Sequence, residues 1–291
     1  RRLREAGIGT YILFQETYNR ERYEAIHPAG PKSDYERQTE AMDRAMDGGI
    51  DDVGLGALFG LELYSYDFVG LLMHAEHLEA AKGVGPHTIS LPRVRPADGV
   101  DPRGFMDAVP DSVFERIVAL VRVAVPYTGI IMSTRESAAM RGRALEIGVS
   151  QISGASKTSI GGYDADDVLE GTKAEDTAQF DVDDRRALDE TVLWLSGLGY
   201  VPSFCTACYR EGRTGDRFMR LAKSGRIADI CQPNALITFR EYLEDYASPK
   251  TKEMGLRVIA GELAKVPSGR VRARTGEYLK GIEAGKRDFR F

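Results

Sequence analysis

The sequence predicts an α/β fold, with a parallel sheet or barrel followed by a smaller, mostly helical domain. Three observations support this prediction. Short β-like runs alternate with helical patterns, the alternation repeats about every thirty residues, and polar side chains follow the β-like runs. The 291 residues exceed a typical single domain, although a barrel can occupy that length alone.

Five β-like runs are expected to form strands, and the first four are each followed by a helical pattern. The segment 33–49 begins with Ser and Asp and ends with Gly, which is the usual punctuation of a helix. In chain order, the expected strand and helix pairs are 7–18 with 33–49, 50–60 with 66–83, 85–94 with 111–125, and 127–135 with 136–148, and the last strand is 149–157.

The remainder of the chain has a different pattern. Residues 157–186 are rich in Gly and Asp and have little periodicity, so we expect a long loop or a cover over the barrel. From residue 187 onward the pattern becomes helical. We therefore predict two domains, 1–186 with the strands and 187–291 with the cysteines.

Composition excludes several classes of protein. A net charge of −5 gives no basic footprint for nucleic acid, and no run of 18 apolar residues indicates a membrane span. Three cysteines cannot form a closed disulfide framework, so we expect reduced thiols and a cytoplasmic protein.

Polar residues stand at the ends of the expected strands, where parallel α/β folds carry their active sites. Helix caps and turns account for Ser137 and Ser156, but buried arginines such as Arg93 and Arg135 need anionic partners. We therefore expect at least one of these arginines to bind a carboxylate or a phosphate. The strand-end residues are Gln15, Glu16, Thr17, Ser90, Arg93, Ser133, Thr134, Arg135, Glu136, Ser153 and Ser156.

All three cysteines lie in one segment with the spacing C-x2-C-x22-C: Cys205, Cys208 and Cys231. Four interpretations remain open on spacing alone. These are a redox pair, a structural zinc site that lacks a fourth ligand nearby in sequence, buried inert thiols, and an iron–sulfur cluster held by three thiolates.

The surroundings of the cysteines give modest support to the cluster. Arg210 and Arg213 could offset negative charge on thiolates, although solvated surface arginines would look the same. His74 and His77 lie three residues apart on one expected helix face. For each of these two histidines, two interpretations remain open: a hydrogen-bonded core residue and a metal ligand.

Several long motifs carry a resemblance to a known family. "GIGTYILFQETYNRERYEAIHPAGPKSDYERQTEAMDRAMDGGIDDVGLGALFGL" and "GVGPHTISLPR" resemble the aromatic-amino-acid lyases of the radical S-adenosylmethionine superfamily. "CTACYREGRTGDRFM", Cys231 and "PNALITFREYLEDYAS" resemble, within that group, the tyrosine lyases that mature FeFe-hydrogenase. The resemblance runs from residue 1 to about residue 250, and it implies a partial (βα)8 TIM-type barrel, made of the last five strands, and a helical domain that holds an auxiliary cluster.

The resemblance also implies a reaction. S-adenosylmethionine is cleaved reductively at a 4Fe-4S cluster, and the resulting radical abstracts hydrogen from the substrate tyrosine. Cleavage of the Cα–Cβ bond then gives p-cresol and dehydroglycine, and dehydroglycine yields carbon monoxide and cyanide for hydrogenase maturation partners. A channel is expected to carry the small product to the second cluster.

Residue roles follow from the same resemblance. Cys205, Cys208 and Cys231 would hold the auxiliary 4Fe-4S cluster, whose extra iron is also bound by a histidine, with His74 as the first match and His77 in reserve. Gln15 and Glu16 would contact S-adenosylmethionine, and Arg93 would pair with its carboxylate. Ser133 and Arg135 would hold tyrosine, because the Arg fork suits a carboxylate.

One departure from the family pattern concerns the first cluster. Its C-x3-C-x2-C motif is not found in the 291 residues, so we expect a fragment that does not cleave S-adenosylmethionine by itself. Two alternatives are a related lyase such as the thiamine-pathway tyrosine lyase (2-iminoacetate synthase), which lacks this cysteine set, and a zinc-stabilised scaffold that is not an enzyme.

Overall fold

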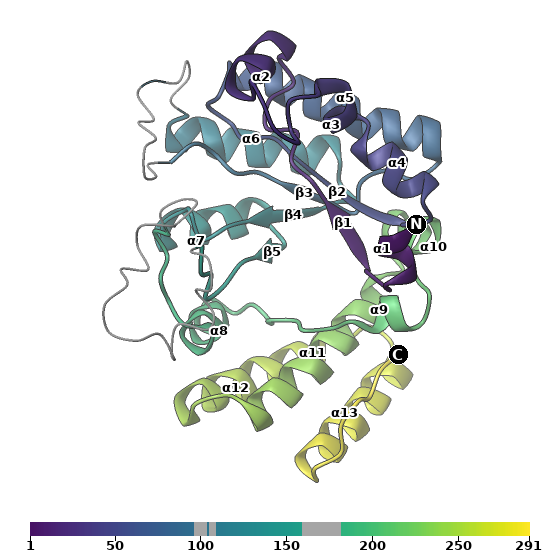
Figure 1. Cartoon of the computed structure of the whole chain (residues 1–291). Helices are drawn as coiled ribbons and strands as arrows, with labels where there is room; N and C mark the ends of the chain where they lie inside the picture. Colours follow the sequence, from purple (N-terminus) through teal and green to yellow (C-terminus); the bar gives the residue numbers. More distant parts are fainter. Residues whose placement is uncertain (96–103, 105–108, 159–181) are drawn as a thin grey trace, which may run out of the picture. The chain divides into compact units, whose positions relative to one another are not determined.

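The computed structural model describes residues 1–95, 104, 109–158 and 182–291 (Figure 1). Within these residues the chain divides into two compact units, Arg1–Arg185 (unit 1) and Arg186–Phe291 (unit 2). Most of the loop or cover predicted over 157–186 lies outside the described residues.

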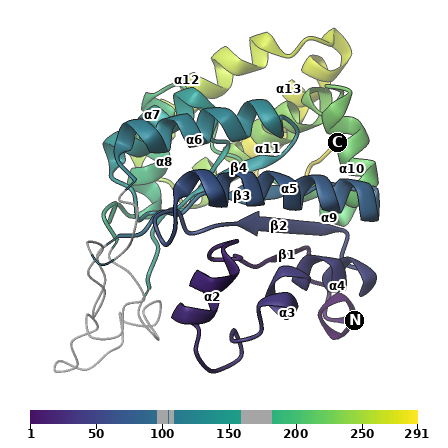
Figure 2. The ribbon, with the colours of Figure 1, turned by 90° about the horizontal axis from the view of Figure 1, so that it is seen from above.

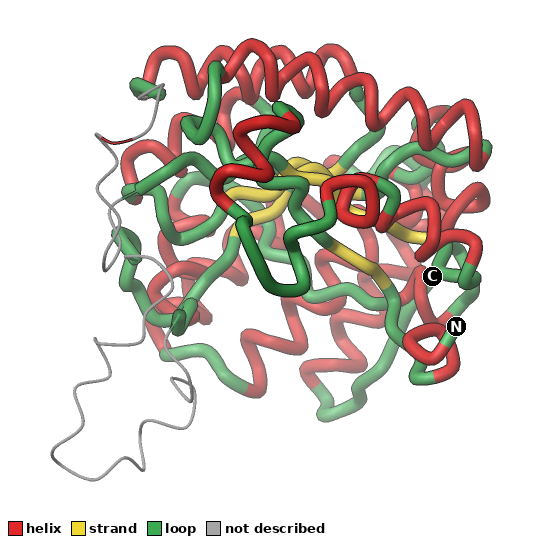
Figure 3. The backbone as a smooth tube through the Cα atoms, turned by 45° about the horizontal axis from the view of Figure 1, so that its top comes forward, coloured by secondary structure: helices red, strands yellow, loops and turns green. Residues whose placement is uncertain are grey.

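Unit 1 contains a five-stranded parallel sheet whose strands follow one another in chain order. Helices separate the strands along the chain, and the strands gather together in yellow in Figure 3. The predicted α/β class with parallel strands is confirmed, although the strands are shorter than the β-like runs: β1 (Thr10–Ile12), β2 (Asp52–Gly56), β3 (Thr88–Ser90), β4 (Gly129–Met132) and β5 (Gln151–Ile152).

The helices of unit 1 follow the predicted order with two differences. The helix expected over 33–49 is broken at Glu40, and a short helix that was not predicted precedes it. In Figure 2, α5 runs alongside β2, which it also contacts. The helices are α1 (Arg2–Glu5), α2 (Arg20–Ile26), α3 (Tyr35–Thr39), α4 (Ala41–Asp47), α5 (Tyr64–Lys82), α6 (Asp111–Ala124) and α7 (Ala138–Ile147).

Local signals account for where several of these helices begin and end. The Ser137 hydroxyl accepts a hydrogen bond from the Met140 N–H at 3.2 Å, which confirms Ser137 as the cap of α7. Asn19 caps α2 in the same way. Helix α5 ends at Gly83, whose φ of 73° is the left-handed conformation that glycine adopts without strain.

The core of unit 1 lies between the sheet and its helices. Leu55, Ile89 and Ile130 on neighbouring strands are buried together with Leu71 of α5 and Phe114 of α6. The alternate strand residues form a second layer, in which Gly54 lies opposite Thr88 and Thr88 opposite Gly129. A Cβ on Gly54 would lie 2.5 Å from the Thr88 hydroxyl, so this layer is packed too closely for a larger residue.

Unit 2 contains helices and no strand, and all of its residues are described. Its apolar core joins α8, α11, α12 and α13 and includes Val192, Phe239, Leu243 and Ile259. No helix in the described ranges is long and apolar enough to cross a membrane. The helices are α8 (Leu188–Gly197), α9 (Ala207–Arg210), α10 (Gly215–Lys223), α11 (Ala228–Asp245), α12 (Pro249–Lys265) and α13 (Gly269–Glu283).

Candidate functional site

Polar side chains gather at the carboxyl ends of the strands in unit 1, beginning with Glu16 just after β1. Glu16 has a φ of 69°, in the left-handed region that a non-glycine residue seldom occupies. Its backbone pairs with Ala57, just after β2, and its carbonyl accepts the Leu58 N–H at 2.8 Å. Its carboxylate forms an ion pair with Lys32. Such backbone strain is concentrated at functional sites.

Gln15, the neighbouring residue, is buried and only 3% exposed. Neither atom of its side-chain amide has a hydrogen-bond partner among the described residues. A buried amide without partners is costly, and it therefore retains a donor and an acceptor for a bound ligand.

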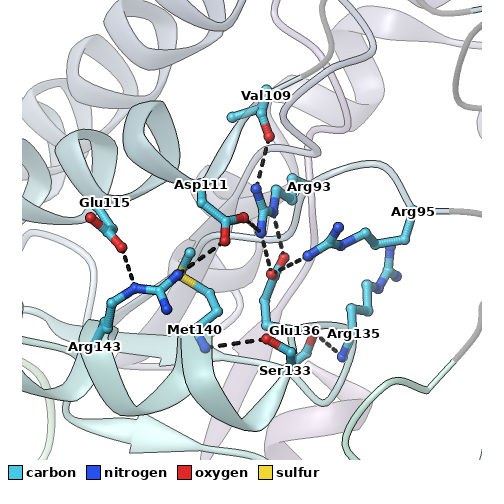
Figure 4. A network of polar contacts seen from close by, with 11 residues as sticks. Arg93, Arg95, Val109, Asp111, Glu115, Ser133, Arg135, Glu136, Met140 and Arg143 are labelled. Carbon is cyan, nitrogen blue, oxygen red and sulfur yellow. Dashed lines mark hydrogen bonds and ion pairs between the residues drawn. The ribbon is translucent and has the colours of Figure 1, made fainter.

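Arg93, just after β3, lies in a network of carboxylates that belong to the chain itself (Figure 4). Its Nε donates to Glu136 at 2.8 Å, and its Nη2 donates to Glu136 and to Asp111, each at 2.6 Å. Its Nη1 donates to the Val109 carbonyl at 2.8 Å. Burial alone would lower the pKa of Arg93, but its hydrogen bonds and charge contacts with these two carboxylates raise it instead.

These contacts engage four of the five N–H donors of Arg93. Glu136 also accepts a hydrogen bond from Arg95 Nη2 at 2.5 Å. The anionic partners expected for a buried arginine are therefore internal carboxylates. The pairing of Arg93 with a cofactor carboxylate stays a prediction, and the geometry favours a positioning role.

Ser133 and Arg135 follow β4. The Ser133 hydroxyl accepts a hydrogen bond from the Arg135 backbone N–H at 3.3 Å (Figure 4). Burial lowers the pKa of Arg135, and the charges of Glu16 and Glu136 act in the opposite direction. The structure thus brings Glu16 after β1 and Arg135 after β4 within electrostatic reach of each other.

His74 lies on α5 and is 91% buried, with an exposed fraction of 9%. Its Nδ1 is 3.0 Å from the Tyr18 hydroxyl, and its Nε2 is buried without a partner among the described residues. Burial lowers the pKa of His74 to about 4, so the imidazole is neutral at physiological pH. The Nδ1 contact is that of a hydrogen-bonded core histidine, and the predicted role of His74 as a metal ligand stays a prediction.

The other two histidines near this sheet have different contacts. His77 is exposed, and its Nε2 lies 2.9 Å from Asp43. His87 directly precedes β3, and its Nδ1 lies 3.6 Å from the buried carboxylate of Asp52, at the opposite end of the strands from Arg93. Burial lowers the pKa of His87, and Asp52 opposes this shift. A buried carboxylate beside an imidazole is a common arrangement around metal-ligating histidines.

Sequence reasoning missed Asp67 in the first turn of α5. Its Oδ1 accepts hydrogen bonds from the Thr17 hydroxyl at 2.8 Å and from the Tyr18 N–H at 2.7 Å. Burial raises the pKa of Asp67 to about 6, although these two bonds act in the other direction. An Asp near a helix start is so common that its position gave no signal of this long-range contact.

The three cysteines all lie in unit 2 and none forms a disulfide. Cys205 precedes α9, Cys208 lies within α9, and Cys231 lies near the start of α11. The Ala207 N–H donates to the Cys205 sulfur at 3.4 Å. Desolvation raises the pKa of Cys231 to about 11, and the charges of Cys208 and Cys205 add to this effect. The three thiols are therefore close enough to influence one another.

The donor set can be compared with the group that the resemblance implies. Arg213 opposes the rise in the pKa of both Cys205 and Cys231, so a cation lies within electrostatic reach of the sulfurs. Across residues 1–95, 109–158 and 182–291, no three His, Cys, Asp or Glu side chains converge closely enough for a single metal ion. Three soft sulfur donors, an N–H···S bond and a nearby cation fit an iron–sulfur cluster, which is larger than one ion.

Comparison with known proteins gives two kinds of match. Residues 90–201 match the Biotin and Thiamin Synthesis associated domain. The 2-iminoacetate synthase of Escherichia coli (strain K12) is 32% identical over 163 residues, which are 55% of this chain and 42% of that protein. The 2-iminoacetate synthase of Salmonella typhimurium is 32% identical over 202 residues, which are 69% of this chain and 51% of that protein.

Two solved structures are similar along nearly the whole chain. A crystal structure of HydG, described as a maturase of the FeFe-hydrogenase, has a TM-score of 0.93 and 52% identity, and the match covers 99% of this chain. The FeFe-hydrogenase maturase HydG from Carboxydothermus hydrogenoformans has a TM-score of 0.76 and 38% identity over 96% of this chain. The chain spans about half the length of the 2-iminoacetate synthases and about 60% of the two HydG chains. The chain is therefore similar in sequence and fold to HydG along nearly its whole length.

Proposed function

We propose that the full-length protein to which these residues belong is a radical S-adenosylmethionine tyrosine lyase that matures FeFe-hydrogenase in the cytoplasm. It would cleave tyrosine to p-cresol and dehydroglycine, and dehydroglycine would give carbon monoxide and cyanide for delivery to maturation partners. The observation that carries the proposal is the trio of mutually influencing thiols in a chain that is 52% identical to a HydG maturase over 99% of its length.

The residues of unit 1 would bind and orient the reactants. Gln15 offers an unpaired buried amide, and Glu16 holds a strained backbone beside it. Ser133 and Arg135 would hold the amino and carboxylate groups of tyrosine, because a partly desolvated guanidinium binds a carboxylate through two parallel hydrogen bonds. Arg93 would act by fixing Glu136 and the adjoining loops.

In unit 2, Cys205, Cys208 and Cys231 would hold the auxiliary 4Fe-4S cluster, and Arg213 would offset its negative charge. When bound, the cluster and its extra iron supply a site for carbon monoxide and cyanide. Of the histidines, we favour His87 over His74 as the ligand of that iron. The Nε2 of His74 is buried and its Nδ1 is bonded to Tyr18, whereas His87 lies beside the carboxylate of Asp52.

The test uses the full-length protein, reconstituted anaerobically and supplied with tyrosine and S-adenosylmethionine. We expect p-cresol and carbon monoxide from the wild type. Replacing Cys231 by Ser should abolish carbon monoxide and leave p-cresol, and a surface variant of unit 2, Ser224→Ala, should change neither. We expect His87→Asn to lower carbon monoxide more than His74→Asn. Undiminished carbon monoxide from the Cys231 variant would contradict the proposal.

Two alternatives predict different results. A lyase of the 2-iminoacetate synthase type would give p-cresol without carbon monoxide even in the wild type. A zinc-stabilised scaffold would bind one zinc per chain with no iron or sulfide. We also propose that the 291 residues alone are inactive in cleaving S-adenosylmethionine, because none of their three cysteines forms a C-x3-C-x2-C motif.

A further inference from the structure

Residues 286–291, which follow α13, contact the segment that carries Cys205 and Cys208. Arg210 and Asp288 form a forked ion pair, with Arg210 Nη2 at 2.9 Å from Asp288 Oδ2. Arg290 Nε lies 2.6 Å from a carboxylate oxygen of Glu211. The same short segment thus holds Arg210, the last residue of α9, and Glu211, its C-cap, which lie two and three residues after Cys208.

The 286–291 segment also contacts α11, which carries Cys231 near its start. The Phe291 N–H donates to the side-chain oxygen of Asn234 at 2.9 Å. Asn234 lies three residues after Cys231 and is only 1% exposed. The Asp288 N–H donates to Glu241 of the same helix at 2.7 Å. One segment therefore bridges the two parts of the chain that carry the cysteines.

Arg213 connects this segment to the thiols themselves. Its Nη2 donates to the Phe291 backbone carbonyl at 2.6 Å. Its charge also acts on Cys205 and on Cys231, as described above. The hydrogen bond fixes the position of a long, flexible cation that would otherwise lose its orientation near the sulfurs.

The segment is itself anchored on α13. The Phe289 ring stacks on Tyr278, with ring centroids 4.5 Å apart and an angle of 17° between the planes. The Phe291 ring lies 5.5 Å from the same tyrosine. Gly281 leaves room for this stack, because a Cβ there would lie 2.9 Å from Phe289 Cζ. The 286–291 segment is thus held on α13 as well as on α9 and α11.

The cysteine segment lies outside the apolar core cluster of unit 2. Every residue of unit 2 is described, and its apolar core cluster includes no residue between Val201 and Leu236. Between Cys205 and Cys231, Ala207 and Met219 are buried outside that cluster. The polar contacts of the 286–291 segment connect this stretch to α11.

We propose that residues 286–291 are a positioning segment, which holds the Cys205–Cys208 segment against the start of α11 so that the three thiols keep the spacing a cluster needs. The role in cluster binding rests on the proposed function, whereas the contacts that hold the Cys205–Cys208 segment do not depend on it.

The first experiment measures hydrogen exchange of residues 205–216 in the metal-free 291-residue chain. Asp288→Arg places a cation beside Arg210 and Arg290, and we expect exchange of this peptide to quicken about fivefold. The matched control is Glu253→Arg, which breaks an exposed ion pair with Arg257 on α12. The double variant Arg210→Asp/Asp288→Arg restores an opposite pair and should restore slow exchange.

The second experiment reconstitutes the same variants with ferrous iron and sulfide and follows the visible absorption of the cluster against a chelator. We expect the half-life to fall about fivefold in Asp288→Arg and to recover in the double variant. If Asp288→Arg does not fold, Gly281→Ala, which displaces Phe289, takes its place in both experiments.

The outcomes separate the two proposals. If the wild type takes up no cluster but Asp288→Arg exchanges faster, the proposed function is overturned and the positioning role of residues 286–291 is supported. If Asp288→Arg matches the wild type in exchange and in cluster retention, the positioning role is overturned and the proposed function stands. The same holds if Asp288→Arg changes these two properties only as much as Glu253→Arg does. Failure of the double variant to recover either property also overturns it.

Discussion

Arg93 and Glu136 form a doubly hydrogen-bonded ion pair between the ends of β3 and β4, with N···O distances of 2.8 and 2.6 Å. Their side chains are only 3% and 2% exposed. The pair ties two neighbouring strand ends together, directly beside the residues proposed to bind tyrosine. Because both charges are buried, removing either partner leaves the other as an uncompensated buried charge, which is strongly destabilising.

We predict that Glu136→Gln lowers the free energy of unfolding of unit 1 by about 3 kcal/mol, because it leaves the buried charge of Arg93 with less compensation. The control is Glu115→Gln, which breaks a more exposed pair with Arg143 and should cost much less, because solvent screens an exposed pair. Urea unfolding is best followed by circular dichroism, since the single tryptophan, Trp194, lies in unit 2. Equal losses in both variants would contradict this account.

We predict opposite effects of Ala at two glycines. Gly54→Ala adds a methyl group that would lie 2.5 Å from Thr88 Oγ1 and 2.7 Å from Ile12 Cγ1. It should cost about 1–3 kcal/mol through overpacking. Gly261→Ala, in the interior of α12 with nothing within 4 Å, should stabilise unit 2 by up to about 1 kcal/mol. Thermal unfolding of both variants checks the two signs.

We predict that Asp67 makes stability fall as pH rises from about 4 to about 6. Its pKa is raised to about 6, mainly by burial, so the folded state holds this proton more tightly than the unfolded chain. The contribution of Asp67 to the free energy of unfolding is therefore fully present below the pKa of Asp in the unfolded chain. It is lost as the pH rises through the folded pKa of about 6, by up to about 3 kcal/mol. Asp67→Asn should flatten this part of the profile relative to wild type, while the exposed Asp216→Asn should not. Parallel profiles for wild type and Asp67→Asn would contradict the prediction.

We predict that Tyr18→Phe destabilises unit 1 by about 1–2 kcal/mol, because it removes the partner of the buried His74 Nδ1. Tyr66→Phe removes a hydroxyl from a tyrosine that is 52% exposed and should change stability little. Chemical denaturation of the two variants gives the comparison. A loss in Tyr66→Phe as large as that in Tyr18→Phe would show that the hydrogen bond is not the cause.

Some features were predictable because they depend on residues near one another in sequence. The alternation of strands and helices predicts the α/β class and its parallel strands, and Ser137 is a helix cap whose partner lies three residues away. The break at Glu40 was missed, since the periodicity of 33–49 continues across it.

By itself, the sequence determined the βα order, the polar strand ends and the grouping of three thiols within 27 residues, because periodicity and spacing are local properties of the chain. Only the tertiary structure decided that Arg93 has Glu136 and Asp111 as partners and that His74 is closed off by Tyr18. It also decided that residues 286–291 reach Arg210 and Asn234. These pairs are separated by 18 to 78 positions, so no local pattern encodes them; burial and charge select them only when the chain has folded.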